Sequence, residues 1–184
     1  MEDLLKDCEH RMQQAIDHMS HDFTTIRTGR ASPAVLERVH VEYYGTETPI
    51  SQIASVSVPE PRQLLIQPYE KNMIAVIERA ILKSDLGLTP NNDGTGIRLN
   101  FPQMTEERRK EMVKQVNARA EQACVAIRNV RRDANEHGKA REKKKEIGED
   151  DLKGFEAKIQ KITDKCIEKV HELQKKKDAE VMEV

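Results

Sequence analysis

The stretch that decides the fold is TEERRKEMVKQVNARAEQACVAIRNVRRDANEHGKAREKKKE, from Thr105 to Glu146. Apolar or small residues recur along it every three or four positions: Val113, Val116, Ala120, Ala123, Ile127, Val130 and Ala134. This period predicts one amphipathic helix with a single buried seam, and Thr105 can cap its N-terminus. The helix would span about 40 residues, or about 60 Å. Globular helices seldom reach that length alone, so the stretch predicts a bundle.

Two other segments have the same period. The segment 2–28 has its apolar positions at Leu5, Cys8, Met12, Ala15 or Ile16, Met19, Phe23 and Ile26. The segment that starts near Glu149 has them at Leu152, Phe155, Ile159, Ile162, Cys166, Val170 and Leu173. A break at Gly148 makes the second and third helices antiparallel, and the first must fill the remaining groove. We therefore expect an elongated antiparallel three-helix bundle.

The region between the first and second helices reads differently. VHVEYYG (39–45), IASVSV (53–58), LLIQPY (64–69) and IRLNF (97–101) are typical of strands, and KNMIAVIERAILKSDLG (71–87) is typical of a helix. The sequence thus predicts an α+β protein. Residues 1–30 and 105–184 would form the bundle, and residues 31–104 would form a small inserted β/α/β domain. Its two short connections to the bundle, at 30–31 and 104–105, are typical of a hinge.

Composition narrows the classes of protein. The chain has 184 residues, 34% charged and 3% aromatic, with a net charge of -1. Residues 108–145 contain 13 Lys and Arg against 5 Asp and Glu, a local charge of +8. The three cysteines have no metal-ligand spacing, which favours free thiols in a reducing compartment. No apolar run approaches the length of a membrane span, and MEDLLKDCEH (1–10) does not resemble a secretory signal, so we expect a cytoplasmic protein.

Part of this positive charge forms a ridge on the long helix. At 100° per residue, Arg128, Arg131 and Arg132 lie on one side, well away from the apolar seam. The same face carries Lys110, Lys114 and Lys139, and Glu121 interrupts it. Such a track, about 45 Å long, can lie along a phosphate backbone. It can equally be a solvated face balanced by Glu residues of neighbouring helices, and the pattern alone leaves both interpretations open.

Basic residues also gather where the bundle meets the insertion. Arg27 and Arg30 flank the first connection, and Arg27 suits a helix C-terminus. Arg108 and Arg109 lie in a first helical turn, where the helix dipole does not favour cations. A contact with a partner is therefore a reasonable explanation for that pair.

Catalytic and metal-binding motifs are absent from the sequence. It has no G-x-x-x-x-G-K-[ST] and no G-x-S-x-G motif, and its histidines form no metal set with its cysteines. NNDGTG (91–96) contains glycines but lacks the lysine and the following helix of a phosphate loop, so it is interpreted as a turn. We therefore expect neither an enzyme nor a bound cofactor or metal.

Five strings together resemble the bacterial ribosome recycling factor family: RTGRASP (27–33), VEYYGTETPI (41–50), SDLGLTPNNDGTGIRLNFP (84–102), TEERRKEM (105–112) and RNVRRDAN (128–135). They cover the chain in order. The resemblance implies an L-shaped, monomeric, two-domain protein with the outline of a transfer RNA. The family binds post-termination ribosomes in the intersubunit space. With elongation factor G, which hydrolyses GTP, it splits them and releases messenger RNA and deacylated transfer RNA.

The resemblance also implies residue roles. Arg131 matches the family's RNVRRDAN motif as the principal contact to large-subunit ribosomal RNA. The expected RNA-binding set is Arg131, Arg128, Arg132, Arg109, Arg108, Lys110, Lys114 and Lys139. The expected interdomain hinge is Gly29, Arg30, Ala31, Ser32, Pro33, Pro102, Gln103, Met104 and Thr105. The sequence departs from the family pattern at Phe101, usually a smaller aliphatic, and at Gln103, commonly a proline. Losing that proline frees a φ angle, which either softens the hinge or alters the fit with the protein's own elongation factor G.

Two other classes compete with this interpretation. One is a coiled-coil adaptor, independent of the ribosome, whose seam or rod face binds another helical protein. Salt discriminates, because phosphate binding weakens steeply with ionic strength and apolar helix pairing does not. The other is an enzyme concealed in residues 31–104, which the lack of a nucleophile–base pair or metal set disfavours.

Overall fold

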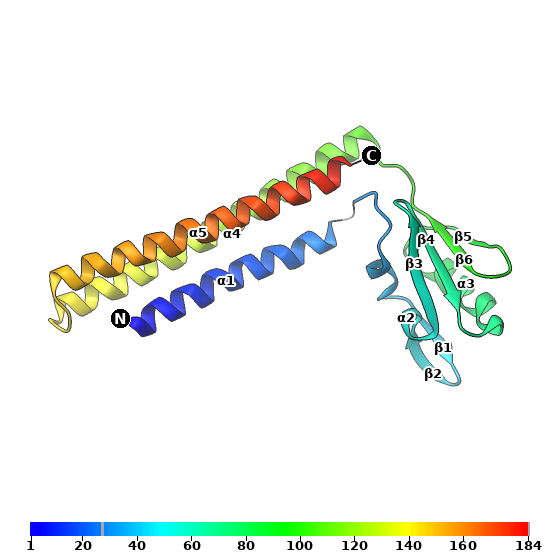
Figure 1. Ribbon diagram of the computed structural model, residues 1–184, viewed down its shortest axis with the longest axis horizontal. Coiled ribbons are helices and arrows are strands. Elements are labelled where there is room, and N and C mark those ends of the chain that lie inside the picture. Colours follow the sequence, from blue (N-terminus) through cyan, green and yellow to red (C-terminus); the bar gives the residue numbers. More distant parts are fainter. Residues whose placement is uncertain (27, 184) are drawn as a thin grey trace. The chain divides into compact units, whose positions relative to one another are not determined.

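The computed structural model describes residues 1–26 and 28–183. The expectations for Arg27, including its position at a helix end, lie outside the described residues. The chain divides into two compact units: Met1–Arg27 with Thr105–Glu183 (unit 1), and Thr28–Met104 (unit 2). The predicted α+β class is confirmed, since unit 1 is helical and unit 2 is built around a small antiparallel sheet (Figure 1).

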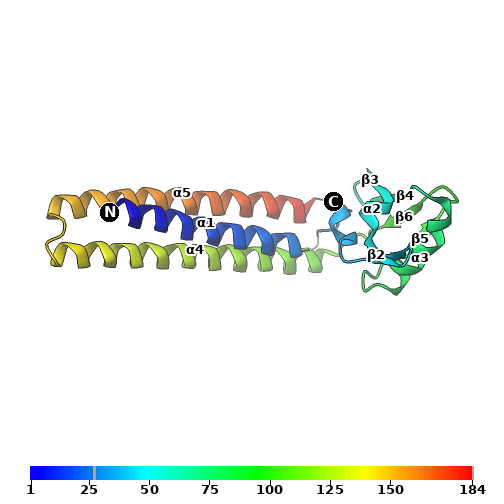
Figure 2. The same cartoon turned by 90° about the horizontal axis from the view of Figure 1, so that it is seen from below.

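Unit 1 is a bundle of three long helices: α1 (Glu2–Thr25), α4 (Glu106–Lys143) and α5 (Glu149–Met182). Figure 2 shows α1 lying alongside α4 and α5 for most of its length. Thr105 caps α4, where its Oγ1 accepts a hydrogen bond from the Arg108 amide at 3.2 Å. The helix ends earlier than the predicted Glu146, because Lys145 adopts a left-handed conformation with φ 59° in the turn to α5. Similarly, α1 ends at Thr25, because Ile26 is extended.

The buried seams of unit 1 agree with the predicted period, with local differences. In α4, Met112 is buried where Val113 was expected, and Val113 is half-buried. In α5, Thr163 is buried while Ile162 and Cys166 are half-buried. The Thr163 hydroxyl donates to the Ile159 carbonyl at 2.8 Å, which satisfies a polar group in the core.

The helices α4 and α5 approach closely at Gly138. A Cβ at this position would lie 2.9 Å from the Phe155 ring and 3.2 Å from Leu152. The position therefore requires a residue without a side chain. Gly154 on α5 is different, since a Cβ there would meet nothing within 4 Å.

Unit 2 contains two antiparallel sheets. The hairpin β1 (His40–Tyr43) and β2 (Thr46–Pro49) leads through α2 (Ile50–Ile53) into the larger sheet. That sheet contains β3 (Ala54–Glu60), β4 (Gln63–Pro68), β5 (Pro90–Asn92) and β6 (Ile97–Asn100), in the order β3-β4-β6-β5. Two 3₁₀ turns, Pro33–Leu36 and Lys71–Met73, and the helix α3 (Ile74–Lys83) complete the unit.

The core of unit 2 lies between the larger sheet and α3. One sheet face contributes Leu64, Ile66, Ile97 and Leu99, and α3 contributes Ile77 and Ile81, each at most 1% exposed. The predicted helix 71–87 is shorter at both ends, and Ser84 closes it by donating from Oγ to the Ile81 carbonyl at 2.6 Å. Strands β2 and β5 were not predicted, because their sequences, TETP and PNN, carry no alternating apolar pattern.

Candidate nucleic-acid interface

Helix α4 carries the whole basic track predicted from the sequence. Two members of the set, Arg109 and Arg131, are half-buried. The exposed members are Arg108, Lys110, Lys114, Arg128, Arg132 and Lys139. Since one continuous helix holds them, their spacing along the track is fixed by the helix rise.

Two of the three ridge arginines have weak internal partners. Arg128 Nη1 lies 3.4 Å from Glu121 Oε1 on the same helix, and both side chains are exposed. Arg131 Nη1 donates at 3.4 Å to Gln160 Oε1 on α5. Within residues 1–26 and 28–183, no hydrogen bond or ion pair engages the Arg132 guanidinium. Exposed pairs of this kind contribute little to stability, so the three guanidinium groups remain available to phosphates.

Unlike the ridge arginines, other arginines form ion pairs with aspartates between α1 and α4. Arg11 of α1 reaches Asp133 at 3.0 Å, and Arg119 of α4 reaches Asp22 at 3.4 Å. Arg141 donates to both oxygens of Asp3, at 3.1 and 2.6 Å. These hydrogen bonds from Arg141, with a smaller contribution from the terminal amine, hold the pKa of Asp3 well below its usual range.

The distribution of these ion pairs helps to decide whether the ridge is a phosphate-binding surface or a solvated face balanced by neighbouring helices. If the ridge were a face balanced by neighbouring helices, acidic residues of α1 or α5 should pair with it. Among the described residues, the cross-helix ion pairs of α4 instead involve Arg119, Asp133 and Arg141. Apart from Glu121 of the same helix, which pairs with Arg128, no described acidic side chain pairs with the ridge, which keeps it positive, as a phosphate-binding surface requires.

The N-terminal end of the track has local pairs only. Lys110 Nζ lies 3.0 Å from Glu106, and Arg108 Nη1 lies 2.9 Å from Glu111. Pairs at these helical spacings contribute about 0.2–0.5 kcal/mol. A phosphate group can replace them at little cost, so they are compatible with binding.

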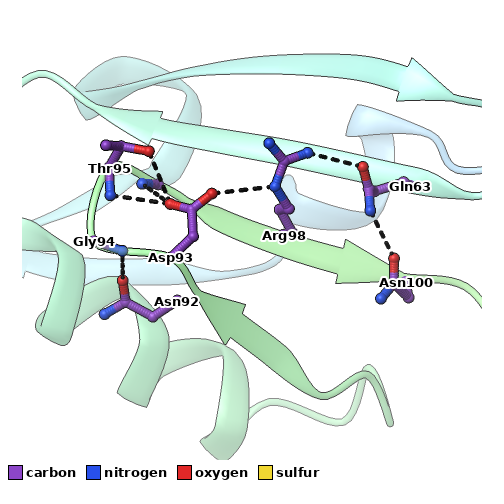
Figure 3. A network of polar contacts seen from close by, with 8 residues as sticks. Gln63, Asn92, Asp93, Gly94, Thr95, Arg98 and Asn100 are labelled. Carbon is purple, nitrogen blue, oxygen red and sulfur yellow. Dashed lines mark hydrogen bonds and ion pairs between the residues drawn. The ribbon is translucent and has the colours of Figure 1, made fainter.

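The glycine-bearing loop 91–96 is a closed turn, as the sequence suggested (Figure 3). One oxygen of Asp93 accepts hydrogen bonds from the Thr95 hydroxyl at 2.8 Å and from the amides of Thr95 and Gly96 at 3.0 and 2.9 Å. The other accepts from Arg98 Nε at 3.1 Å. These bonds, the Thr95 hydroxyl's first, hold the pKa of Asp93 well below its usual range. The chain's own carboxylate thus occupies the amides that a phosphate would need.

The connections between the units include hydrogen-bonded segments and segments outside any helix or strand. The Ala31 amide donates to the Pro61 carbonyl and the Phe101 amide donates to the Arg62 carbonyl, each at 2.8 Å. Ser32 caps the 3₁₀ turn that Pro33 begins, and Thr105 caps α4. A Cβ at Gly29 would lie 3.6 Å from Met104 Cγ. Pro102 and Gln103 are exposed and outside any helix or strand, and Arg30 is also exposed.

In the described ranges, no group of three or more His, Cys, Asp or Glu side chains is arranged to hold a metal ion. None of the helices built from residues 1–26 and 28–183 combines the length and apolar character of a membrane span.

Comparison with known proteins identifies the family. The family model for the ribosome recycling factor matches residues 19–182. The chain belongs to the ribosome recycling factor family. Its relatives in that family include the ribosome-recycling factor of Carboxydothermus hydrogenoformans, 52% identical over 100% of both chains. The factor of Bacillus thuringiensis is 54% identical over 98% of both chains. The resemblance found in the five sequence strings is thereby confirmed.

Solved structures of the family resemble this chain over its full length. A solution structure of the ribosome recycling factor matches with a TM-score of 0.77 and 40% identity, covering 100% of this chain and 97% of that one. A model of the Thermus thermophilus factor matches with a TM-score of 0.65 and 43% identity, covering 99% and 98%. That factor is described with Escherichia coli elongation factor G, bound to the Escherichia coli post-termination complex.

Proposed function

We infer that this chain recycles ribosomes after termination. It binds the post-termination ribosome and, with elongation factor G and GTP hydrolysis by that partner, splits it into subunits, releasing messenger RNA and deacylated transfer RNA. The observation that carries this function is the family match over 19–182 together with full-length relatives. The solved relative on a post-termination complex with elongation factor G supports both partners.

Arg131 is the principal contact to large-subunit ribosomal RNA, in the intersubunit space. Its guanidinium donates one hydrogen bond across the bundle, at 3.4 Å, to the neutral side-chain amide of Gln160 on α5. A phosphate therefore offers a stronger, charge-assisted partner. The full RNA-contacting surface is Arg131, Arg128, Arg132, Arg109, Arg108, Lys110, Lys114 and Lys139. Its narrowness limits non-specific RNA binding, because only RNA that fits the shape of the bundle can reach all of it.

The chain itself carries out no chemical step. It acts in the cytoplasm as a monomer, by binding and by changing the relative position of its two units, and it needs no cofactor. The energy source is the GTP hydrolysed by its partner.

The hinge comprises Gly29 to Pro33 and Pro102 to Thr105. The Ala31 and Phe101 amides are hydrogen-bonded to the turn 61–62, which restrains the backbone at these two positions. Rotation is therefore expected at the other residues of the hinge. Gln103, in an unpaired segment, is where a proline would restrict φ most directly. Gln103→Pro should slow or speed recycling with a given elongation factor G. Unchanged recycling rate and unchanged distance between spin labels on the two units would remove this role.

The function is tested by light scattering of post-termination ribosomes mixed with this protein, elongation factor G and GTP. The wild type should lower the scattering as subunits separate. Arg131→Ala should slow this step by about tenfold or more, as expected for loss of a charge-assisted contact. Arg119→Ala, which removes the same charge from another side of α4, is the matched control. A wild type that leaves scattering unchanged with a compatible elongation factor G would contradict the function.

A further inference from the structure

The turn of the β1–β2 hairpin holds an unexpected residue. Tyr43 pairs with Thr46, so Tyr44 and Gly45 form a two-residue turn, with φ of 48° and 81°. Turns of this kind favour Asn, Asp or Gly, since positive φ disfavours a bulky side chain. Tyr44 nevertheless occupies the first position with its side chain 77% exposed. Strain retained at an exposed aromatic residue points to a role outside the turn.

The Tyr44 side chain is held in place by Glu70, which lies between β4 and the 3₁₀ turn Lys71–Met73. Its hydroxyl donates to Glu70 Oε2 at 3.0 Å, and the Tyr43 hydroxyl donates to Glu70 Oε1 at 2.8 Å. The two rings meet edge to face, with centroids 4.5 Å apart. The hydrogen bonds to Glu70 raise the pKa of both tyrosines, so the phenols stay neutral and keep donating to the carboxylate.

The surroundings of this cluster are negative. Among the contacts of the described residues, no cation lies within ion-pair distance of Glu70, although Lys71 follows it in the chain. Glu42 and Glu47 stand directly opposite each other across the hairpin, and both are exposed. Like charges at such positions are destabilising, and the faces of aromatic rings are also negative. At the tyrosines the attraction for a cation comes from Glu70 and the ring faces, while Glu42 and Glu47, on the other face of the hairpin, add negative charge to the hairpin as a whole.

We propose that Tyr43, Tyr44 and Glu70 form a docking site for an arginine side chain of a basic protein segment. The planar guanidinium stacks on the Tyr44 ring and donates to the carboxylate oxygens of Glu70. An arginine suits the site better than a base of RNA, because the neighbouring carboxylates oppose the RNA backbone. The site lies in unit 2, whereas the basic track belongs to α4 of unit 1, and the proposal does not depend on the function proposed above.

The chain offers a specific optical probe of this site. It has no Trp and three Tyr, of which two belong to the cluster and the third, Tyr69, directly precedes Glu70. Tyrosine fluorescence of the full chain therefore reports on this region alone. Titration with an acetylated, amidated hexa-arginine peptide should give a saturable change in emission. A neutral glycine–serine peptide of equal length should give none.

Three variants locate the binding. Tyr44→Asn removes the ring with a residue that the turn favours, and Glu70→Gln removes the charge with little change of shape. Each should weaken binding of the peptide by about tenfold or more. Glu172→Gln removes the same charge from an exposed position of α5 and should leave binding unchanged. Circular dichroism confirms that each variant is folded.

Three results would overturn the proposal. The first is the lack of a saturable change with the wild type up to millimolar peptide. The second is equal weakening by Glu172→Gln and Glu70→Gln, which indicates diffuse attraction to an acidic protein. The third is a change of emission with oligoadenylate that Tyr44→Asn abolishes and hexa-arginine does not reproduce, which indicates a stacking platform for nucleic-acid bases.

Discussion

Helix α4 uses the same residue type in opposite ways on two of its sides. Facing α1, Arg119 and Arg141 form ion pairs with aspartates of that helix, at 3.4 and 2.6 Å. On the ridge, Arg128, Arg131 and Arg132 have a glutamate of their own helix, a glutamine, or no partner among the described residues. Helix α4 thus pairs its arginines with acidic residues where it faces α1, and on the ridge the described residues provide no acidic partner from another helix.

The largest effect is expected from removing the ridge. The triple variant of Arg128→Ala, Arg131→Ala and Arg132→Ala should lower affinity for large ribosomal subunits by at least about a hundredfold, since each lost phosphate contact is charge-assisted. Its helicity and melting temperature should stay close to those of the wild type. Binding by sedimentation and melting by circular dichroism measure both. An affinity equal to that of the wild type would contradict the proposed binding role of the ridge.

The packing of the bundle can also be tested without changing an arginine, at the contact between α4 and α5. Gly138→Ala should destabilise the protein by about 1–3 kcal/mol, because the new methyl group meets the Phe155 ring at 2.9 Å. Gly154→Ala is the matched control on the partner helix. It should stabilise by up to about 1 kcal/mol, because nothing lies near the added Cβ. Urea unfolding measures both, and equal effects would show that α4 and α5 do not meet closely at Gly138.

Acid should weaken the ion pair between Arg141 of α4 and Asp3 of α1. The pKa of Asp3 is depressed by its hydrogen bonds from Arg141, below an ordinary value of 3.8. Its contribution to stability is therefore complete above that value and is lost as the pH falls through the folded-state value. Asp3→Asn should lower the melting temperature at neutral pH and flatten its decline below about pH 4. Asp85→Asn, at an exposed carboxylate of unit 2, is the control and should leave the acid profile unchanged.

The smallest effect concerns how Arg131 is held. Gln160→Leu removes the amide oxygen that accepts its hydrogen bond at 3.4 Å. Because that bond is long, stability should change by no more than about 0.5 kcal/mol, and ribosome affinity should change by less than about threefold. A tenfold loss of affinity would instead assign Gln160 a direct part in positioning Arg131. Melting and sedimentation of the same sample separate the two effects.

The sequence predicted the features that repeat along one helix. The seam residues from Val116 to Ala134 recur with the helical period, and each is buried. The same arithmetic predicted outward positions for Arg128, Arg131 and Arg132. Arg128 and Arg132 are exposed, whereas Arg131, which lies nearer the seam, is half-buried. The sheet core was predicted from the alternating strands, which place Leu64 and Ile66 on one face.

The features that depend on a second element were not predicted. Gly138 is required only because Phe155 of another helix packs against it. Thr163 is buried because its hydroxyl is satisfied locally, which hydrophobic periodicity does not register. The pairing of Arg119 and Arg141 could have been predicted from their positions on the helical wheel. At 100° per residue, Arg119 and Arg141 lie about 180° and 140° from Arg128, on the seam side of the helix where an unpaired charge is disfavoured.

The most direct test of the central claim is the salt dependence of binding to large ribosomal subunits, compared for the wild type, Arg131→Ala and Arg119→Ala. If the ridge contacts phosphates, Arg131→Ala should weaken binding by about tenfold and reduce the slope of log affinity against log salt by about 1. Arg119→Ala should leave the affinity and the slope at the wild-type values. Equal losses for the two variants would contradict the division of α4 into a structural side and a binding side.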